Sequence, residues 1–204
     1  MKHIKKSKGQ TIKKQTRDLI LDVTFSLIYQ HGYNATGISA ILKKCNIPKG
    51  SLYHHFKSKK ELVLVMIKER LSPKMDIFFS FENKDNENSI DIIIETINKI
   101  SDNENLVKYN CPLNRLNIEL SNSDKDFDNE LNKIFTNIQN RIILLLDKSI
   151  KNNEIKQIDT NSLSEFIITA TWGALSLSSN QSSQERFINN TSHLKQYLLS
   201  LKTN

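Results

Sequence analysis

The sequence is poor in residues that interrupt helices. It contains only 5 Gly and 3 Pro among 204 residues, and no Asn-Gly or Asp-Gly turn joins two alternating segments of the kind that form a β-hairpin. The composition, with 38% apolar and 25% charged residues, lies in the range of globular proteins. The sequence therefore predicts an all-α protein that is long enough for one large core or two modest ones.

Long hydrophobic runs are also missing. The longest candidate, FIITATWGALSL from Phe166, falls short of the roughly 18 apolar residues that a membrane-spanning helix needs. The first ten residues are basic, but no apolar segment follows them as it would in a signal peptide. We interpret residues 1–10 as a mobile basic arm and expect a cytoplasmic protein with no membrane partner.

The sequence offers little of the chemistry that enzymes and metal sites need. Cys45 and Cys111 are far apart and belong to no CxxC motif, which excludes a disulfide framework and a zinc site. Two adjacent histidines, His54 and His55, point in different directions on a helix and do not chelate a metal as a pair. We find no glycine-rich phosphate loop, carboxylate pair or Ser/His/Asp spacing, so we predict neither catalysis nor a metal or other cofactor.

Charge is distributed unevenly along the chain. Residues 1–74 hold 16 Lys or Arg against 4 Asp or Glu, and residues 75–204 hold 13 against 18. A general preference for lysine would affect both parts equally. The N-terminal third is therefore predicted to bind a polyanion, and nucleic acid is the leading candidate.

Helical periodicity and breaker residues predict a helix-turn-helix in this basic region. A long first helix, residues 11–31, is stopped by Gly32, and a short helix from Ile38 ends near Cys45. Asn46 suits a left-handed C-cap, and Pro48 suits the first turn of the next short helix. Two short helices that meet across about three residues are typical of a motif whose second helix enters the major groove.

Farther along, a capping box formed by Ser58 and Glu61 predicts the start of a fourth helix, and Ser72-Pro73 predicts a kink or break in it. More helices are expected from Ser89, from Pro112 and over residues 126–150. Two further helices close the chain.

The segment RDLILDVTFSLIYQHGYNATGISAILKKCNIPKGSLYHHFKSKKEL, residues 17–62, resembles the DNA-binding domain of TetR/AcrR-family transcriptional regulators. The matching positions are Arg17, Ile20-Leu21-Asp22, Gly32-Tyr33, Ala35-Thr36, Ile41, Gly50, Leu52-Tyr53, Phe56, Lys59 and Glu61-Leu62. The resemblance implies an all-helical dimer with an N-terminal three-helix DNA-binding domain, taken as residues 11–60. It also implies a C-terminal helical domain for ligand binding and dimerisation, taken as residues 61–204.

The predicted recognition helix supplies most of the expected DNA contacts. Gly50 removes bulk where the helix would approach the duplex, while charge, hydroxyl and imidazole groups around it can reach phosphates or base edges. Lys59 follows at the start of the fourth helix, where the family contacts the DNA backbone, and Thr36 is expected to act similarly. The predicted DNA-binding residues are Thr36, Lys49, Gly50, Ser51, Tyr53, His54 and Lys59.

The C-terminal domain carries the predicted homodimer and the inducer site. We expect the homodimer to form through the last two helices, with packing inside the chain as the alternative. One side of the first is lined, beside Gly173, by Leu163, Phe166, Ile167, Ala170, Ala174 and Leu177, and small residues there permit close approach of another helix. In the second, a narrow apolar seam that suits a partner is formed by Phe187, Thr191, Leu194, Leu198 and Leu201. Phe135, Ile138, Phe166 and Trp172 are candidates for lining a cavity for a small-molecule inducer, with plain core packing as the alternative.

Cys111 directly precedes Pro112, at an expected helix N-cap. Exposed amides there can stabilise a thiolate that senses electrophiles or oxidants; the alternative is an unreactive, half-buried residue.

Together these features predict a ligand-responsive regulator, with repression as the family's common mode. It would bind a palindromic operator in double-stranded DNA as a dimer and be released by an inducer. The alternative is a DNA-binding or nucleoid-type protein that responds to no ligand, since charge and helix content fit both.

Overall fold

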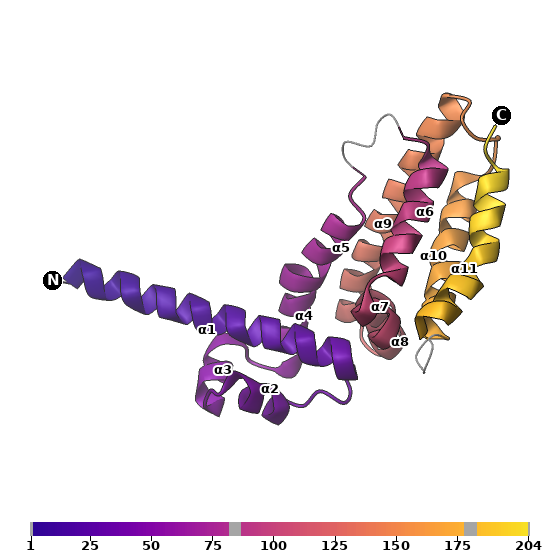
Figure 1. Ribbon diagram of the computed structural model, residues 1–204. Helices are drawn as coiled ribbons and strands as arrows, with labels where there is room; N and C mark the ends of the chain where they lie inside the picture. Colours follow the sequence, from indigo (N-terminus) through magenta and orange to yellow (C-terminus); the bar gives the residue numbers. More distant parts are fainter. Residues whose placement is uncertain (1, 82–86, 178–182, 204) are drawn as a thin grey trace. The chain divides into compact units, whose positions relative to one another are not determined.

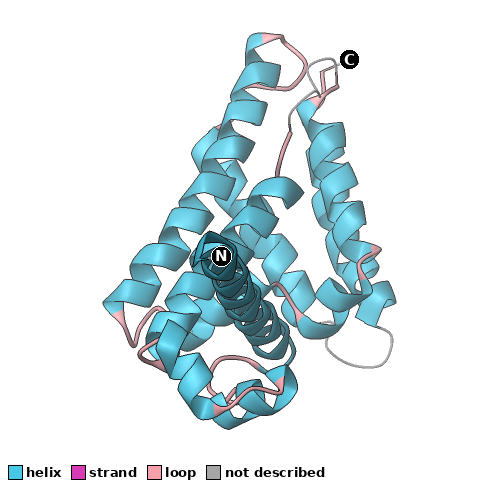
Figure 2. Cartoon of the chain, turned by 90° about the vertical axis from the view of Figure 1, so that its left-hand side faces the viewer, coloured by secondary structure: helices cyan, strands magenta, loops and turns pink. Residues whose placement is uncertain are grey.

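The structure is a computed structural model that describes residues 2–81, 87–177 and 183–203. Within these ranges the backbone forms helices and loops (Figure 2). One isolated β-bridge pairs Ile155 with Lys202. The predicted all-α class is confirmed. Figure 1 gives the helix labels used below.

The chain divides into two compact units, which we call the head and the body. The head comprises Met1–Lys74 together with Leu116–Leu131, and the body comprises Met75–Arg115 and Asn132–Asn204. A functional boundary after residue 60 stays a prediction.

Helix α1 spans Lys2–His31 and is longer than the sequence pattern predicts. Residues 2–10, expected as a mobile arm, continue the helix in the structure, since Gly9 is the one breaker residue among them and a single glycine is tolerated. The predicted stop at Gly32 is confirmed: its φ is +86°, a left-handed conformation that glycine adopts without strain. A Cβ at Gly32 would also collide with Oε1 of Glu119.

The helix-turn-helix consists of α2, Ile38–Cys45, and α3, Lys49–His55. Asn46 caps α2 with φ 52° and ψ 48°, as predicted. Pro48 occupies the N-cap of α3, one position earlier than predicted. Ile41 and Leu52 are fully buried and fix the two helices in the core of the head.

Helix α4, Lys59–Met66, begins where the capping box predicts. The backbone N–H of Glu61 donates to Oγ of Ser58 at 3.1 Å, and Oε2 of Glu61 accepts from the backbone N–H of Lys57 at 2.7 Å. These reciprocal bonds satisfy amides at the helix start that would otherwise lack a partner.

The helical path does not break at Ser72-Pro73, where the sequence predicts a kink or break; the type of helix changes there instead. A π-helical turn, Ile67–Leu71, follows α4 directly, and α5, Ser72–Phe78, continues from it. Proline cannot donate to the carbonyl four residues before it, here that of Glu69. That carbonyl instead accepts a bond from Nη1 of Arg70 at 3.2 Å, so the chain accommodates Pro73 without ending the helical path.

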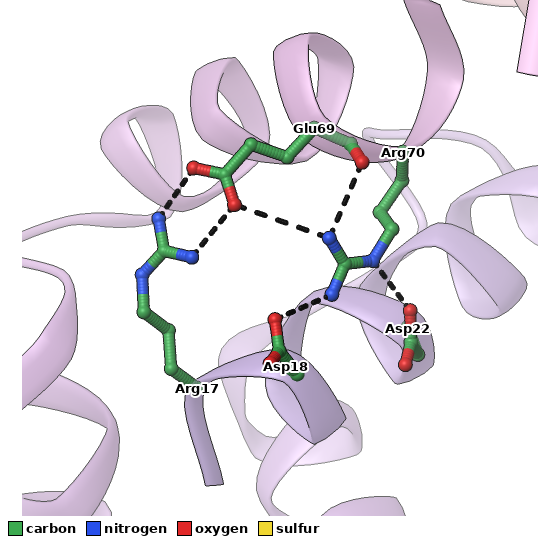
Figure 3. Close-up of polar contacts among 5 residues, drawn as sticks. All are labelled: Arg17, Asp18, Asp22, Glu69 and Arg70. Carbon is green, nitrogen blue, oxygen red and sulfur yellow. Dashed lines mark hydrogen bonds and ion pairs between the residues drawn. The ribbon is translucent and has the colours of Figure 1, made fainter. Parts of the chain in front are cut away.

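The π turn is tied to α1 by a network of charged side chains (Figure 3). Arg17 donates two parallel bonds to Glu69, at 2.7 and 2.6 Å. Arg70 donates to Asp18 at 2.8 Å and to Asp22 at 2.5 Å. A bidentate Arg–carboxylate pair fixes orientation as well as distance, so these contacts set the position of the π turn on α1.

We expect this network to make the stability of the protein sensitive to acid. The bonds from Arg17 hold the pKa of Glu69 below its ordinary value of 4.5. A lowered pKa stabilises the fold above the unfolded-state pKa, and this contribution is lost as the pH falls through the folded-state pKa. The free energy of unfolding, measured in urea from pH 7 to pH 3, should fall from about pH 5 downward. The free energy of unfolding of Glu69→Gln should fall less steeply with pH. The control is Glu165→Gln, at an exposed residue of the body, which should fall as steeply as wild type. If Glu69→Gln also falls as steeply as wild type, Glu69 does not contribute to the acid sensitivity.

A second segment of the chain, Leu116–Leu131, belongs to the head although it lies far away in the sequence. It contains the end of α8, Pro112–Leu120, and the start of α9, Lys125–Lys151. Glu119 accepts the backbone N–H of Asn34 at 3.0 Å, and the ring of Phe127 meets that of Tyr33 edge to face at 5.5 Å. Nothing in the periodicity of the sequence indicated this packing.

Two acidic residues of the same segment pair with Lys60 at the start of α4. Nζ of Lys60 lies 2.7 Å from a carboxylate oxygen of Asp124 and 2.7 Å from one of Asp126. Lys60 is therefore engaged inside the head.

The body contains α6, Ser89–Ser101, and the rest of α9, together with α10, Thr160–Ser176, and α11, Ser183–Ser200. It also contains a short helix that the sequence analysis missed, α7, Glu104–Tyr109. Asn88, Asn103 and Asp159 cap α6, α7 and α10 by accepting backbone N–H groups. Helices expected from Ser89, from Pro112 and over 126–150 are confirmed.

The apolar seam of α11 is buried within the body. Phe187 and Leu198 are fully buried, and Thr191, Leu194 and Leu201 are nearly so. The seam therefore packs inside the chain, which was the alternative interpretation, and a second copy would have to use a different face. Exposed apolar side chains on α10 and α11 include Phe166 and Tyr197, whose rings meet edge to face at 5.9 Å.

Candidate nucleic-acid interface

Helix α3 exposes one face and buries the other. Leu52 is fully buried, and Phe56, which caps the helix, is 1% exposed. Lys49, Gly50, Tyr53 and His54 are exposed, and Ser51 is half-buried. Five of the seven predicted DNA-binding residues therefore lie on one short helix.

Gly50 is not required by packing within the described chain. A Cβ built at this position has no described atom within 4 Å. Glycine in a helix costs stability relative to alanine, so a glycine in open space points to a requirement outside the fold. Close approach to another molecule supplies such a requirement.

The side chains around Gly50 combine charge with aromatic surface. Nζ of Lys49 lies 5.7 Å from the ring centroid of Tyr53, which is 42% exposed. This is cation–π distance, so the lysine charge and the phenol are presented side by side. A lysine and a phenol can both donate to phosphate oxygens.

The two histidines meet edge to face at 5.3 Å. Burial, with the nearby charges of His54, Arg17 and Lys13, lowers the pKa of His55. The lowered pKa favours the neutral form of His55. No group of three or more residues suited to a metal ion occurs among the described side chains.

Two predicted DNA-binding residues have partners inside the head. Thr36 is buried, and its hydroxyl donates to the carbonyl of Gly32 at 2.7 Å. Lys59 donates to the carbonyl of Tyr33 at 2.7 Å and lies 4.0 Å from the centroid of that ring. Both side chains hold the loop between α1 and α2. Lys59 has three donors, so this bond leaves others for a phosphate.

Basic residues that the site prediction omitted extend this surface. Lys43 and Lys44 near the end of α2, and Lys57 just after α3, are all exposed. Arg17 lies 5.6 Å from the ring centroid of Phe56 at the end of α3. The excess of positive charge in residues 1–74 was the sequence signal for them.

Comparison with known proteins shows which family this chain belongs to. Residues 20–66 match the family model described as bacterial regulatory proteins, tetR family. A Lactococcus lactis protein, described as an uncharacterized HTH-type transcriptional regulator in the lacX 3' region, is 33% identical over 131 residues, or 63% of this chain and 67% of that protein. The chain belongs to the TetR family. It is a DNA-binding transcriptional regulator of a family that is not enzymatic.

Two further similar proteins are a transcriptional regulator and a solved structure that shares the fold. The biofilm operon icaADBC negative transcriptional regulator IcaR of Staphylococcus aureus is 32% identical over 116 residues, which cover 56% of this chain and 59% of IcaR. A crystal structure of a TetR regulator from Chloroflexus aurantiacus aligns with a TM-score of 0.83 at 22% identity, covering 94% of this chain and 98% of that one. No helix among the described residues is long and apolar enough to cross a membrane.

The residues predicted to bind an inducer fall into two groups. Trp172 packs its ring 5.7 Å from that of Phe135, and its indole donates a hydrogen bond to the thiol of Cys111. Ile138, on α9 with Phe135, is buried. Phe166 stands apart, because it is 48% exposed and lines a surface groove of about 380 Å³ with Tyr197 and Leu163.

Cys111 occupies the predicted position before α8, but its environment contradicts the argument for a reactive thiolate. Burial raises the pKa of the Cys111 thiol, and hydrogen bonds from the backbone of Asn114 and Leu113 and from Trp172 oppose this only in part. The helix start does bond the sulfur, as predicted, but the side chain is buried. The structure therefore supports the unreactive alternative.

We expect Cys111 to react slowly with thiol reagents. In a Cys45→Ser variant, the alkylation rate with iodoacetamide at pH 7.5 should be about 100-fold lower for the folded protein than for the protein in urea, because the thiol must open to solvent and ionise first. A Cys111→Ser variant, which keeps Cys45, is the matched control. Burial raises the pKa of the Cys45 thiol as well. Equal rates in folded and unfolded protein would restore the sensor hypothesis.

Proposed function

We propose that this TetR-family protein is a repressor that binds an inverted-repeat operator as a homodimer and releases it on binding a small molecule. The exposed face of α3, with Gly50 in open space between Lys49 and Tyr53, is the observation that carries the proposal. Repression is favoured by the likeness to IcaR, which is described as a negative regulator. A protein that acts on a bacterial chromosome works in the cytoplasm, where we place it.

Chromatin capture in its own bacterium tests this function. The wild-type protein should enrich a small number of promoter sites, and Tyr53→Ala/His54→Ala should lose that enrichment because it removes two exposed groups of the recognition helix. Lys151→Ala, at an exposed lysine of the body, is the control. Transcripts at the enriched sites should rise when the gene is deleted. Diffuse capture along the chromosome would favour a nucleoid-type protein, and falling transcripts would favour an activator.

The outward face of α10 supports a homodimer. Phe166, Ala170, Gly173 and Leu177 recur at intervals of four, three and four residues, so they share one side of the helix. Phe166 and Leu177 are 48% and 67% exposed, and a Cβ at Gly173 would meet no described atom within 4 Å. Two large apolar groups that flank small residues suit close packing against the same face of a second copy.

The inducer is best accommodated near Trp172. Phe135 and Trp172 present aromatic surface, and the backbone of Asn114 and the side chain of Trp172 both bond the thiol of Cys111. Aromatic surface beside one amide side chain, that of Asn114, suits an uncharged, mostly apolar molecule that carries a single hydrogen-bonding group.

Helix α8 offers a covalent route from that site to the head. It begins beside Cys111 and contains Asn114, and near its end Glu119 accepts the backbone N–H of Asn34. A ligand that binds one position of α8 more tightly than another would shift the equilibrium between two states of the head. The size of that shift is limited by the difference between the ligand's two affinities.

A further inference from the structure

His55, the last residue of the recognition helix α3, lies among positive charges. Its side chain is half-buried, and its ring centroid is 5.3 Å from that of His54 and 6.3 Å from that of Phe56. From α1, the guanidinium of Arg17 lies over the ring of Phe56, and the exposed Lys13 lies one turn before it along the same helix. A positively charged imidazolium at His55 would be repelled by groups on both helices.

The free protein consequently favours the neutral ring. Burial is the largest cause of the lowered pKa of His55, and the positive charges of His54, Arg17 and Lys13 lower it further. Glu69 belongs to the same cluster, but both of its carboxylate oxygens accept bonds from Arg17. A neutral imidazole has one N–H donor and one nitrogen that only accepts, and a phosphate oxygen offers that second nitrogen no donor.

A DNA duplex would reverse this balance. The exposed side chains of Tyr53 and His54 place the proposed DNA-facing surface one and two residues from His55, and the phosphates create a strong negative potential there. A negative charge within about 4 to 6 Å of a titratable group favours its positively charged form. It also offsets the repulsion from Arg17 and Lys13. The approach of the polyanion therefore makes a positive charge at His55 less costly.

Resting on the proposed function of α3, we propose that each copy takes up one proton from solvent at His55 when it binds DNA, so that a fall in pH tightens binding to the operator. The proton adds to the ring nitrogen that lacks a hydrogen, and the imidazolium then has two N–H donors. This uptake involves no base, so pH should change the affinity and leave the preferred operator sequence unchanged. Acidification of the cell would favour DNA binding at a constant level of inducer.

The direction of the effect follows from the linkage of proton binding to DNA binding. A group whose pKa is higher in the complex than in the free protein strengthens binding fully below the free-state pKa, and this contribution is lost as the pH rises through the pKa of the complex. Between the two values, the affinity falls by up to about 10-fold for each pH unit and each copy bound. Measurements from pH 5.5 to pH 8.5 cover both sides of 6.5, the ordinary pKa of histidine.

The test measures the dissociation constant of the full chain over this pH range, at constant salt, for a duplex that the wild-type protein selects from a random pool. His55→Asn removes the titrating ring and keeps a polar side chain with N–H donors. The matched control is His193→Asn, the same change at an exposed histidine of the body. Wild type and control should bind more weakly as the pH rises, and His55→Asn should lose most of this dependence.

Calorimetry gives a second measurement that does not require the variant to fold. Wild-type protein is titrated with the same duplex at pH 6.5 in PIPES and in imidazole, two buffers that release different heats on ionising, and the difference gives the number of protons taken up. We expect uptake of up to one proton for each copy bound. An equal pH dependence in His55→Asn and wild type, or no proton uptake, would overturn the proposal while the function of α3 stands. If the wild type selects and binds no duplex, the proposed DNA-binding function itself fails.

Discussion

Replacing Phe166 of α10 and its C-cap residue Leu177 with glutamate should convert the protein to monomers and weaken its binding to an inverted repeat by 100-fold or more. Phe166→Glu/Leu177→Glu would place four carboxylates in the proposed interface of the dimer. Each copy should still fold, because both side chains are exposed in the single chain. Two linked heads bind two half-sites about 10² to 10⁴ times more tightly than one head binds one half-site, and that gain is lost in a monomer.

The control uses exposed apolar residues elsewhere in the body. Ile77→Glu/Leu144→Glu makes the same chemical change at side chains that are 77% and 69% exposed. Light scattering should give twice the chain mass of 23.6 kDa for wild type and control and the chain mass for the α10 variant. A dimeric α10 variant would show that the copies pair through another surface.

Enlarging residue 50 should weaken DNA binding in proportion to the size of the side chain and leave the fold intact. Gly50→Ala should weaken binding about 10-fold and Gly50→Leu about 100-fold or more, losses of about 1.4 and 2.8 kcal/mol, because each added group holds α3 away from the duplex. Since the space around Gly50 is open within the chain, neither change should destabilise the protein. Both variants should be more stable by up to about 1 kcal/mol, because glycine is a poor helix former.

The series separates function from folding. Binding should be measured by anisotropy on a duplex selected by the wild-type protein, and stability by urea unfolding of the same samples. A loss of affinity that follows the size of the side chain, with constant or higher stability, supports contact at Gly50. If Gly50→Leu binds like wild type, α3 does not approach DNA at this point.

The sequence predicted most of the head because its signals are local. Gly32, Asn46 and the Ser58 capping box each depend on residues within one turn, and all three fix helix ends as expected. The buried face of α3 followed from the spacing of Leu52 and Phe56. Short-range backbone and capping preferences act whatever the rest of the chain does.

What the sequence could not predict depends on contacts between distant residues. Thr36 and Lys59 look like free polar groups until the loop they hold is in place. Glu119 lies 85 residues from its partner Asn34, and no periodicity relates the two.

Burial misled the interpretation of two other features. The seam of α11 has the pattern of an interface but packs inside the body. Cys111 has the helix start that favours a thiolate, but the cost of desolvation is the larger effect. Both outcomes depend on how deeply a residue lies, which spacing along the chain does not encode.

Selection of duplexes from a random pool, followed by native mass spectrometry of the selected complex, tests the central claim most directly. The account predicts enrichment of an inverted repeat whose half-sites are one or more helical turns apart, bound by two copies of the chain, with enrichment lost in Tyr53→Ala/His54→Ala. Enrichment of no sequence, or of one that this double variant binds equally well, would contradict the claim that the exposed face of α3 reads DNA.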